Sequence, residues 1–201
     1  YRFTNYLNDP LDSLSISNDY IMDIKEDNYG DLWIATKNGL NKLNREYGTF
    51  KRYCSNESNE NGLRHNFTTS ILVDKEGDLW ISTLGGYLHQ FNIQREEFKV
   101  FPYETKYDIV NIQYDLILDG ELIWILNGGS STKVFNKLTH QFTDINQYVS
   151  KENSEGELKN INGGHTCMIK DTLGNYYFGN YHERGAFLNI KNGNVENLML
   201  G

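Results

Sequence analysis

Short apolar runs of four to eight residues, bounded by Gly, Asn or Asp, follow one another along the chain. They are rich in β-branched and aromatic residues, which favour extended backbone, while the bounding residues favour turns. Almost no stretch repeats its apolar positions with the period of about 3.6 residues that an amphipathic helix needs. The pattern therefore predicts an all-β protein.

The expected strands form four groups of four, each group an antiparallel sheet with short connections. In chain order the groups are Tyr20–Lys25, Leu32–Thr36, Gly39–Asn44 and Thr49–Tyr53; Phe67–Val73, Leu79–Thr83, Gly86–Asn92 and Glu97–Phe101; Asn111–Leu118, Leu122–Leu126, Thr132–Asn136 and Gln141–Ile145; His165–Lys170, Tyr176–Gly179, Gly185–Ile190 and Val195–Leu200.

A phrase of the form Asp-x-x-Gly-x-Leu-Trp joins the first two strands of a group. Its marker aromatics lie 47, 44 and 53 residues apart, and a period in the forties indicates one supersecondary unit repeated. The Asp carboxylate is expected to bond the backbone just ahead, and the Gly to take a positive φ. We assign structural roles to Asp27, Gly30, Trp33, Asp74, Gly77, Trp80, Trp124, Gly174 and Tyr177.

The second strands decide between architectures. Leu32–Thr36 begins with apolar residues in succession, whereas a sheet with one wet face should alternate apolar and polar positions. Each sheet must then be covered on both faces, as in the radially packed blades of a β-propeller. The blades are expected at residues 20–53, 67–101, 111–145 and 165–200, in a single propeller segment spanning 1–201. Residues 1–7 resemble the outer strand of a preceding blade.

Composition narrows the functional classes. The chain of 201 residues has a net charge of −8 and no basic stripe, which argues against nucleic-acid binding. No run approaches the roughly 18–20 apolar residues of a membrane helix, so we predict no direct membrane insertion. Cys54 and Cys167 lack zinc spacing and are expected to be ordinary, mostly buried thiols. No metal or cofactor is predicted, since the Asp turns lack the alternating ligands of a calcium loop.

The chain opens without Met, which indicates a piece of a longer protein. The cut faces of such a piece would expose apolar surface, so we expect association with the remaining blades or as a homodimer.

Ligand-binding candidates come from loops that a propeller gathers at one end of its central channel. Such loops precede each first strand or join the second strand to the third. Aromatic rings there can stack on sugar faces, and Arg or His can pair with acidic groups. The candidates are Arg64, His65, Tyr87, His165, Tyr181, His182 and Arg184. Turn chemistry and solvent exposure are by themselves an adequate explanation of these loops.

The repeated phrase resembles the two-component regulator propeller repeat. In the first group the resemblance rests on Asp19, Ile21, Ile24, Asp27, Gly30, Leu32, Trp33, Ile34, Thr36, Gly39 and Leu40. The second group matches almost as well from Asn66 to Gly86. After residue 101 the match weakens, with Ile123 as an apparent insertion and Tyr177 in place of Trp.

This resemblance implies a sensor. Such repeats build the periplasmic ligand-detecting region of Bacteroides-type hybrid two-component histidine kinases, usually in seven-bladed propellers that detect oligosaccharides. The segment itself is then not an enzyme. Two alternatives remain open, a protein-interaction scaffold and a lyase or hydrolase like the streptogramin lyases, which share this kind of repeat. His165 and His182 would be the acid–base candidates of such an enzyme.

Overall fold

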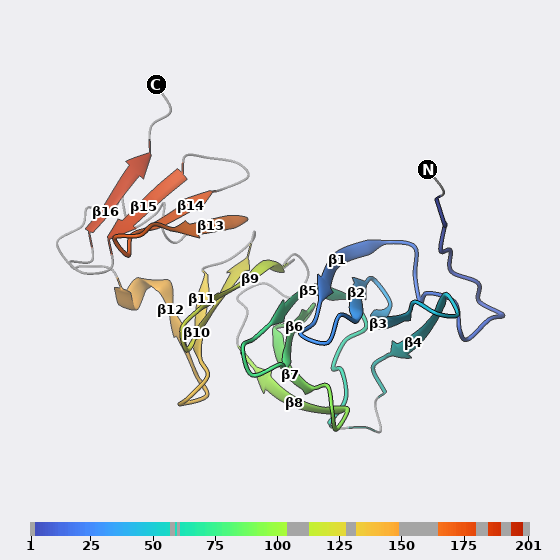
Figure 1. The fold of residues 1–201 in the computed structure, drawn as a ribbon. Helices are drawn as coiled ribbons and strands as arrows, with labels where there is room; N and C mark the ends of the chain where they lie inside the picture. Colours follow the sequence, from blue (N-terminus) through green and yellow to red (C-terminus); the bar gives the residue numbers. More distant parts are fainter. Residues whose placement is uncertain are drawn as a thin grey trace. The chain divides into compact units, whose positions relative to one another are not determined.

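The computed structural model describes residues 3–56, 59, 61–103, 113–127, 132–148, 165–179, 185–189 and 194–198. These residues form four-stranded antiparallel sheets whose strands pair in chain order (Figure 1). We call them blades 1 to 4. Blade 1 contains β1 (Ile21–Glu26), β2 (Leu32–Thr36), β3 (Gly39–Asn44) and β4 (Thr49–Tyr53); blade 2 contains β5 (Thr68–Val73), β6 (Leu79–Thr83), β7 (Tyr87–Asn92) and β8 (Glu97–Pro102).

Blades 3 and 4 follow the same plan. Blade 3 contains β9 (Gln113–Asp119), β10 (Leu122–Asn127), β11 (Lys133–Asn136) and β12 (Gln141–Asp144), followed by the short helix η1 (Ile145–Tyr148); blade 4 contains β13 (Cys167–Lys170), β14 (Tyr176–Gly179), β15 (Gly185–Asn189) and β16 (Asn194–Leu198).

The predicted all-β class is confirmed, and every strand lies within two residues of its expected bounds. Ile145, expected to end a strand, instead begins η1. The chain divides into two compact units, Tyr1–Glu104 with blades 1 and 2, and Thr105–Gly201 with blades 3 and 4. Each unit is described by itself.

The leading strand predicted at residues 1–7 is not formed across the described residues 3–7. A strand exists only as one side of a hydrogen-bonded ladder. The outer edge of blade 1 is occupied by another segment, since the Phe50 N–H donates to the Leu14 carbonyl at 2.7 Å. Arg52 fastens this segment by donating to the Ser15 carbonyl at 2.7 Å, which covers an otherwise open sheet edge.

In the Asp turn one Asp carboxylate accepts hydrogen bonds from the turn backbone and from the aromatic side chain that follows it. We call this arrangement the staple. In blade 1 the carboxylate of Asp27 accepts the N–H groups of Tyr29 at 2.8 Å and Asp31 at 3.0 Å, and the indole N–H of Trp33 at 2.8 Å. Gly30 has a φ of +85°, as expected for this turn. Asp27 is buried, so these bonds compensate the desolvation of its charge. The predicted hydrogen bonds from the turn backbone to the Asp carboxylate are confirmed. The hydrogen bond from the indole N–H was not predicted.

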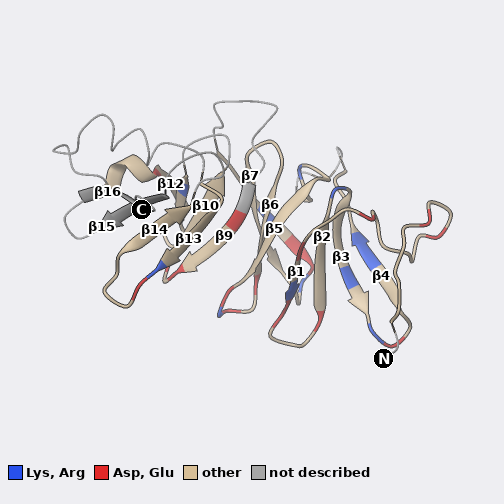
Figure 2. Cartoon of the chain, turned by 90° about the horizontal axis from the view of Figure 1, so that it is seen from above, with Lys and Arg blue, Asp and Glu red and all other residues tan. Residues whose placement is uncertain are grey.

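Blades 2 and 4 repeat the staple. Asp74 accepts the indole N–H of Trp80 at 2.8 Å, and Asp171 accepts the hydroxyl of Tyr177 at 3.1 Å. A Tyr can therefore replace the Trp because its hydroxyl reaches the same carboxylate. The turns that carry these Asp residues stand out as acidic segments in Figure 2.

Blade 3 lacks the staple. Its turn pairs Asp119 with Leu122 and is one residue shorter than the others, so the departure is a deletion in the turn and not an insertion at Ile123. The indole N–H of Trp124, fully buried, finds no acceptor among the described residues. Asp119 instead accepts hydrogen bonds from Lys170 at 2.7 and 2.8 Å and from the hydroxyl of Tyr176.

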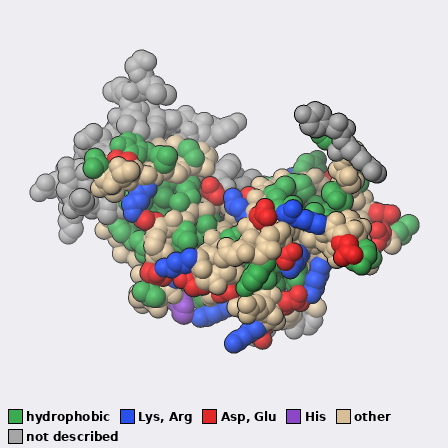
Figure 3. Space-filling model, viewed as in Figure 1, with side chains coloured by type: hydrophobic (Ala, Val, Ile, Leu, Met, Phe, Trp, Pro, Cys, Tyr) green, Lys and Arg blue, Asp and Glu red, His purple; other side chains and the backbone are tan. Residues whose placement is uncertain are grey.

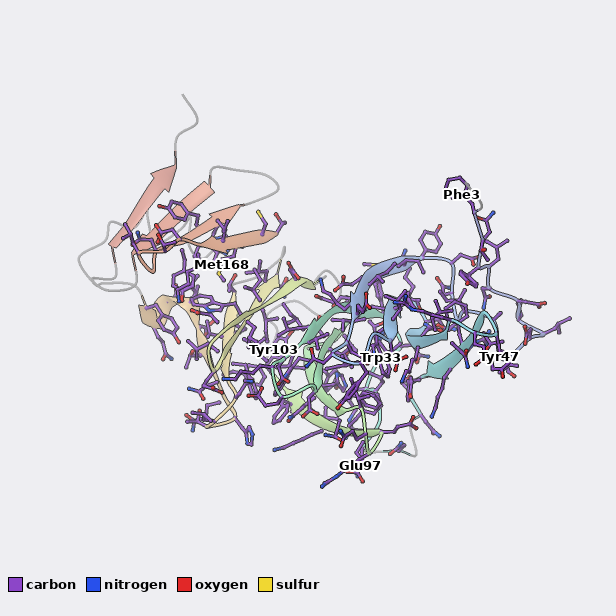
Figure 4. The ribbon with its side chains drawn as sticks, viewed as in Figure 1. Phe3, Trp33, Tyr47, Glu97, Tyr103 and Met168 are labelled. Atoms are coloured by element: carbon purple, nitrogen blue, oxygen red, sulfur yellow. The ribbon has the colours of Figure 1, made fainter. Side chains whose placement is uncertain are left out.

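The marker aromatics pack one blade against the next, as the two-sided apolar pattern predicts. Trp33, labelled in Figure 4, packs against blade 2 with its ring centre 5.5 Å from that of Phe91. It also lies 5.6 Å from Tyr53 of its own blade. In the second unit Trp124 packs on blade 4, 4.8 Å from Tyr176 and 5.9 Å from Phe178. Each unit is thus a pair of blades joined by an aromatic core.

A Lys, a Tyr and a carboxylate reinforce each pair. In the first unit Glu96 of blade 2 binds Lys51 and the hydroxyl of Tyr53 on blade 1, and this holds the pKa of Glu96 below its usual value. Glu96 takes a φ of +56°, a left-handed conformation uncommon for residues other than Gly.

The equivalent cluster of the second unit is Asp119 with Lys170 and Tyr176. Partial burial opposes ionisation of Asp119, but the hydrogen bonds from Lys170 and Tyr176 outweigh it and lower the pKa of the carboxyl. Burial, together with the bond to Asp119, raises the pKa of Tyr176 to about 12. Both clusters therefore act as charge-assisted clamps between neighbouring blades.

We predict that Trp33→Phe destabilises its unit more than Trp124→Phe destabilises the other. The first change takes a hydrogen bond from the buried Asp27 carboxylate, worth about 1–3 kcal/mol, whereas the second removes an N–H that has no described acceptor. Hydrogen exchange, followed on peptides that cover β2 and β10, measures the stability of the two units separately. Equal losses of protection would contradict the staple.

Candidate functional site

One end of the first unit gathers the loops that the sequence predicts for ligand binding. At this end β1 and β5 begin, β2 and β6 end, and β3 and β7 begin. Equivalent backbone bonds close it in both blades, from Lys37 N–H to the Tyr20 carbonyl at 3.2 Å and from Leu84 N–H to the Phe67 carbonyl at 2.9 Å. We call this region the loop end of the first unit.

Gly39 lets the two blades approach at the loop end. Its N–H donates to the carbonyl of Asn66, in the loop that enters blade 2, at 2.6 Å. The φ of Gly39 is +110°, and a Cβ there would come within 2.6 Å of the Tyr53 carbonyl oxygen. A side chain is therefore excluded at this position, and the backbones of the two blades lie close together here. We call this closely packed backbone the platform.

An aromatic and cationic cluster lies on this platform. The ammonium of Lys37 is 4.2 Å from the ring centre of Tyr20 and 5.8 Å from that of Phe67. Tyr20 is 65% exposed. The cluster offers a ring edge and a positive charge to solvent, a combination suited to a sugar with an acidic substituent. None of the three is among the predicted binding residues, although Tyr20 and Phe67 begin predicted strands and Lys37 follows one.

The predicted residues Arg64 and His65 lie in the loop that enters blade 2, and both are exposed. The Nδ1 atom of His65 accepts the N–H of Phe67 at 2.9 Å. The backbone N–H of Arg64 donates to Nε2 of His89 at 3.1 Å. This hydrogen bond holds in place the backbone that carries the Arg64 side chain.

His89 is the residue that sequence reasoning missed. It lies in β7, opposite Ile81 of β6, and is fully buried. Its Nδ1 is 3.3 Å from the Ile81 carbonyl oxygen, so a neutral ring with the proton on Nδ1 satisfies both nitrogens. Burial is the main cause that lowers the pKa of His89 to about 4. Tyr87, half-buried, has its ring centre 6.2 Å from that of His89.

Blade 1 has the same arrangement with a different residue. Asn41 lies opposite Ile34, is fully buried, and accepts the N–H of Ser17 at 2.9 Å with its side-chain oxygen. Its amide nitrogen is 3.4 Å from the Ile34 carbonyl oxygen. Each loop that enters a blade of the first unit is thus held by one buried polar side chain on the third strand. We call this contact the loop latch.

The remaining predicted residues belong to the second unit. His165 is buried, with Nδ1 3.0 Å from the Thr132 hydroxyl and its ring centre 4.7 Å from that of Phe178. Tyr181, His182 and Arg184 lie outside the described residues. Of the predicted residues, Arg64 contacts His89 through its backbone N–H and Tyr87 through its ring.

No group of three or more His, Cys, Asp or Glu side chains among the described residues could hold a metal ion. Contrary to expectation, Cys54 and Cys167 are exposed free thiols, because one follows an outermost strand and the other begins an innermost strand. None of the described helices is long and apolar enough to cross a membrane.

Comparison with known families decides the repeat type. The model of the two component regulator propeller family matches residues 15–38 and 62–85, which cover the turn phrases of blades 1 and 2. These two stretches resemble two-component regulator propeller repeats. No curated protein sequence matches it.

Solved structures show the same fold. The extracellular domain assigned to a hybrid two component system of B. thetaiotaomicron is similar with a TM-score of 0.75 and 20% identity, over 98% of this chain and 27% of the other. A second extracellular domain from that organism, assigned to a one component system, gives 0.69 and 20%, over 97% and 26%. The chain thus spans about a quarter of these relatives, and its fold is that of a β-propeller built from four-stranded blades.

A more distant likeness is to a lyase. A catalytically inactive virginiamycin B lyase from Staphylococcus aureus, solved with quinupristin, is similar with a TM-score of 0.65 and 11% identity, over 92% of this chain and 58% of the other. At this identity the likeness concerns the fold alone.

We predict that the stability contributed by the loop latch of blade 2 depends on pH. Because the pKa of His89 is lowered from 6.5 to about 4, the folded state disfavours the charged ring. Stability is then fully present above pH 6.5 and falls by about 3 kcal/mol as the pH drops towards 4.

His89→Asn, which installs the residue used by blade 1, should keep the latch and remove this pH slope. His89→Leu should remove both. Urea denaturation of the three proteins at pH 7.5 and 4.5 measures the difference, and an unchanged slope in His89→Asn would show that other groups cause it.

Proposed function

We propose that this chain is part of the ligand-sensing propeller of a periplasmic two-component receptor, and that it binds an oligosaccharide. The observation that carries the proposal is the presence of regulator repeats in a fold shared with extracellular domains of two-component systems. A sensor needs a binding surface on a rigid scaffold, and propeller blades provide one. The parent receptor would supply the further blades and the histidine kinase.

The loop end of the first unit is the proposed binding surface. It presents the exposed Arg64, His65, Lys37 and Tyr20, with Tyr87 at the start of β7 on the same end of blade 2. The rings can stack on sugar faces and the two cations can pair with an acidic sugar substituent. The loop latch and Gly39 hold the backbone of this surface in place.

A lyase remains the alternative, since a virginiamycin B lyase shares the fold. His165, one of its two acid–base candidates, is buried against Thr132 and Phe178. A buried ring that contacts no open surface is poorly placed to exchange protons with a substrate. This position supports the binding role over the catalytic one.

We predict that Arg64→Ala and Tyr87→Ala each weaken oligosaccharide binding by about tenfold or more, which corresponds to about 1.4 kcal/mol. Calorimetry with neutral and acidic oligosaccharide panels measures the affinity. Arg45→Ala and Tyr47→Ala are matched controls, because they remove the same residue types from the β3–β4 turn at the opposite end of a blade.

Equal losses in the test and control variants would contradict the assigned surface. Conversion of a sugar into a product, abolished by His182→Ala, would favour the enzyme instead. Absence of binding to every panel member by the folded chain would remove the oligosaccharide from the proposal.

A further inference from the structure

Thr83 carries a buried hydroxyl that has no hydrogen-bond partner among the described residues. The residue ends β6 at the loop end of the first unit, pairs with Tyr87 of β7, and is fully buried. A hydroxyl removed from water normally keeps a partner, because leaving it unpaired costs free energy. Such an atom at a candidate binding surface points to a group that the described chain does not supply.

Blade 1 shows how the matching hydroxyl is satisfied. Thr36 ends β2 and lies opposite Gly39, as Thr83 lies opposite Tyr87. The hydroxyl of Thr36 donates to the Gly39 carbonyl at 2.9 Å and accepts the N–H of Asn38 at 3.0 Å. It also lies 3.0 Å from the hydroxyl of Ser17. All three partners belong to blade 1 or to the loop that enters it.

Blade 2 differs in both of the segments that supply these partners. The loop latch matches Ser17 with Arg64, since each donates its backbone N–H to the buried side chain on the third strand. No hydroxyl therefore comes from the loop that enters blade 2. The connection from β6 to β7 is one residue longer than that from β2 to β3, and it contains Gly85 and Gly86 with φ of +92° and +80°. These segments are described, and neither reaches the Thr83 hydroxyl.

A half-buried aromatic ring lies beside this hydroxyl. Residues that face each other across an antiparallel pair have their Cβ atoms about 4.5–5.5 Å apart and on the same face, which places Tyr87 next to Thr83. The ring rests on the loop backbone, because a Cβ built on Gly85 would lie 3.2 Å from Cε2 of Tyr87. A change of the Tyr87 rotamer would thus give a group from solvent access to the hydroxyl.

We propose that Thr83 is a specificity-determining contact of the oligosaccharide site, and that its hydroxyl binds the hydroxymethyl group of a hexose that packs against Tyr87. This inference rests on the proposed function. The side chain of Ser17 is itself a hydroxymethyl group, so the sugar would supply the chemical group that blade 1 supplies from its own loop. The hydroxymethyl group projects one carbon beyond the sugar ring, which lets it reach a partner below the surface.

A short-range contact of this kind can select a sugar where charge does not. On the face of the molecule in Figure 3, basic and acidic side chains are interspersed and form no patch of one sign. A site that bonds a particular hydroxyl binds the analogue lacking that hydroxyl less tightly. We therefore expect a hexose to bind better than the pentose of the same ring configuration, which has no hydroxymethyl group.

The first test is made without a sugar. Thr83→Val removes a hydroxyl that has no partner, so the urea midpoint of the chain should stay the same or rise. Thr36→Val is the matched control and should lower the midpoint, because it leaves the Asn38 N–H and the Ser17 hydroxyl without their partner. Equal losses in the two variants would show that the Thr83 hydroxyl is already bonded in the free chain, and would overturn the contact.

The second test is calorimetry with cellobiose, lactose and mannobiose, and with xylobiose, which differs from cellobiose only in lacking the hydroxymethyl groups. We expect Thr83→Val to weaken binding of at least one hexose disaccharide by about tenfold or more, to the affinity that the unaltered chain has for xylobiose. The affinity for xylobiose itself should not change.

The remaining outcomes separate this inference from the proposed function. Equal weakening of cellobiose and xylobiose would mean that the substitution disturbs the loop end as a whole, and the hydroxymethyl contact would be wrong. Weaker binding in Arg64→Ala with unchanged binding in Thr83→Val would leave the proposed function standing and remove the contact. Failure of the unaltered chain to bind any oligosaccharide, neutral or acidic, would remove both.

Discussion

A buried carboxylate that accepts an indole N–H is the contact on which the blades depend. In blade 1 the Asp27 side chain closes the first hairpin and orients Trp33 at the same time. The oriented ring then packs against Phe91 on the face of the neighbouring blade. Turn geometry and blade packing are therefore coupled through one side chain, because a buried charge must be satisfied and each donor that satisfies it becomes fixed in position.

Departures from this contact show how the fold compensates. Blade 3 shortens its turn and loses the staple, and its Asp119 turns to Lys170 and Tyr176 of blade 4. The first unit has a similar clamp in Glu96, Lys51 and Tyr53, although its residues come from different strands. In both units a charge-assisted bond joins neighbouring blades close to the aromatic core. The charged side chains of both pairs stay partly exposed, so each ion pair by itself contributes modestly to stability.

In the first unit the residues that support the loops differ from those of the proposed binding surface. His89 and Asn41 are fully buried and hold the loops that enter the blades. Arg64 and Tyr20, which the proposed function uses, are exposed on the platform that these latches steady. Such a division lets loop side chains change with the ligand while the backbone stays in place. Exchange of Asn for His at the latch adds a proton-sensitive group and keeps the acceptor for the loop N–H and the contact with the second-strand carbonyl.

The sequence alone determined the class of fold, the strand bounds within two residues and the Asp turn, because these follow from short apolar runs bounded by turn residues and from bonds between residues a few positions apart. It also placed Arg64 and His65 in the loop that enters blade 2, and Tyr87 at the start of a third strand. Tertiary structure decided the rest. The Glu96 clamp joins residues 45 positions apart, and the His89 latch is a buried His whose partner is a backbone N–H 25 positions away. Residues 3–7 read as a strand but form none, since a strand requires a neighbour that local sequence cannot supply.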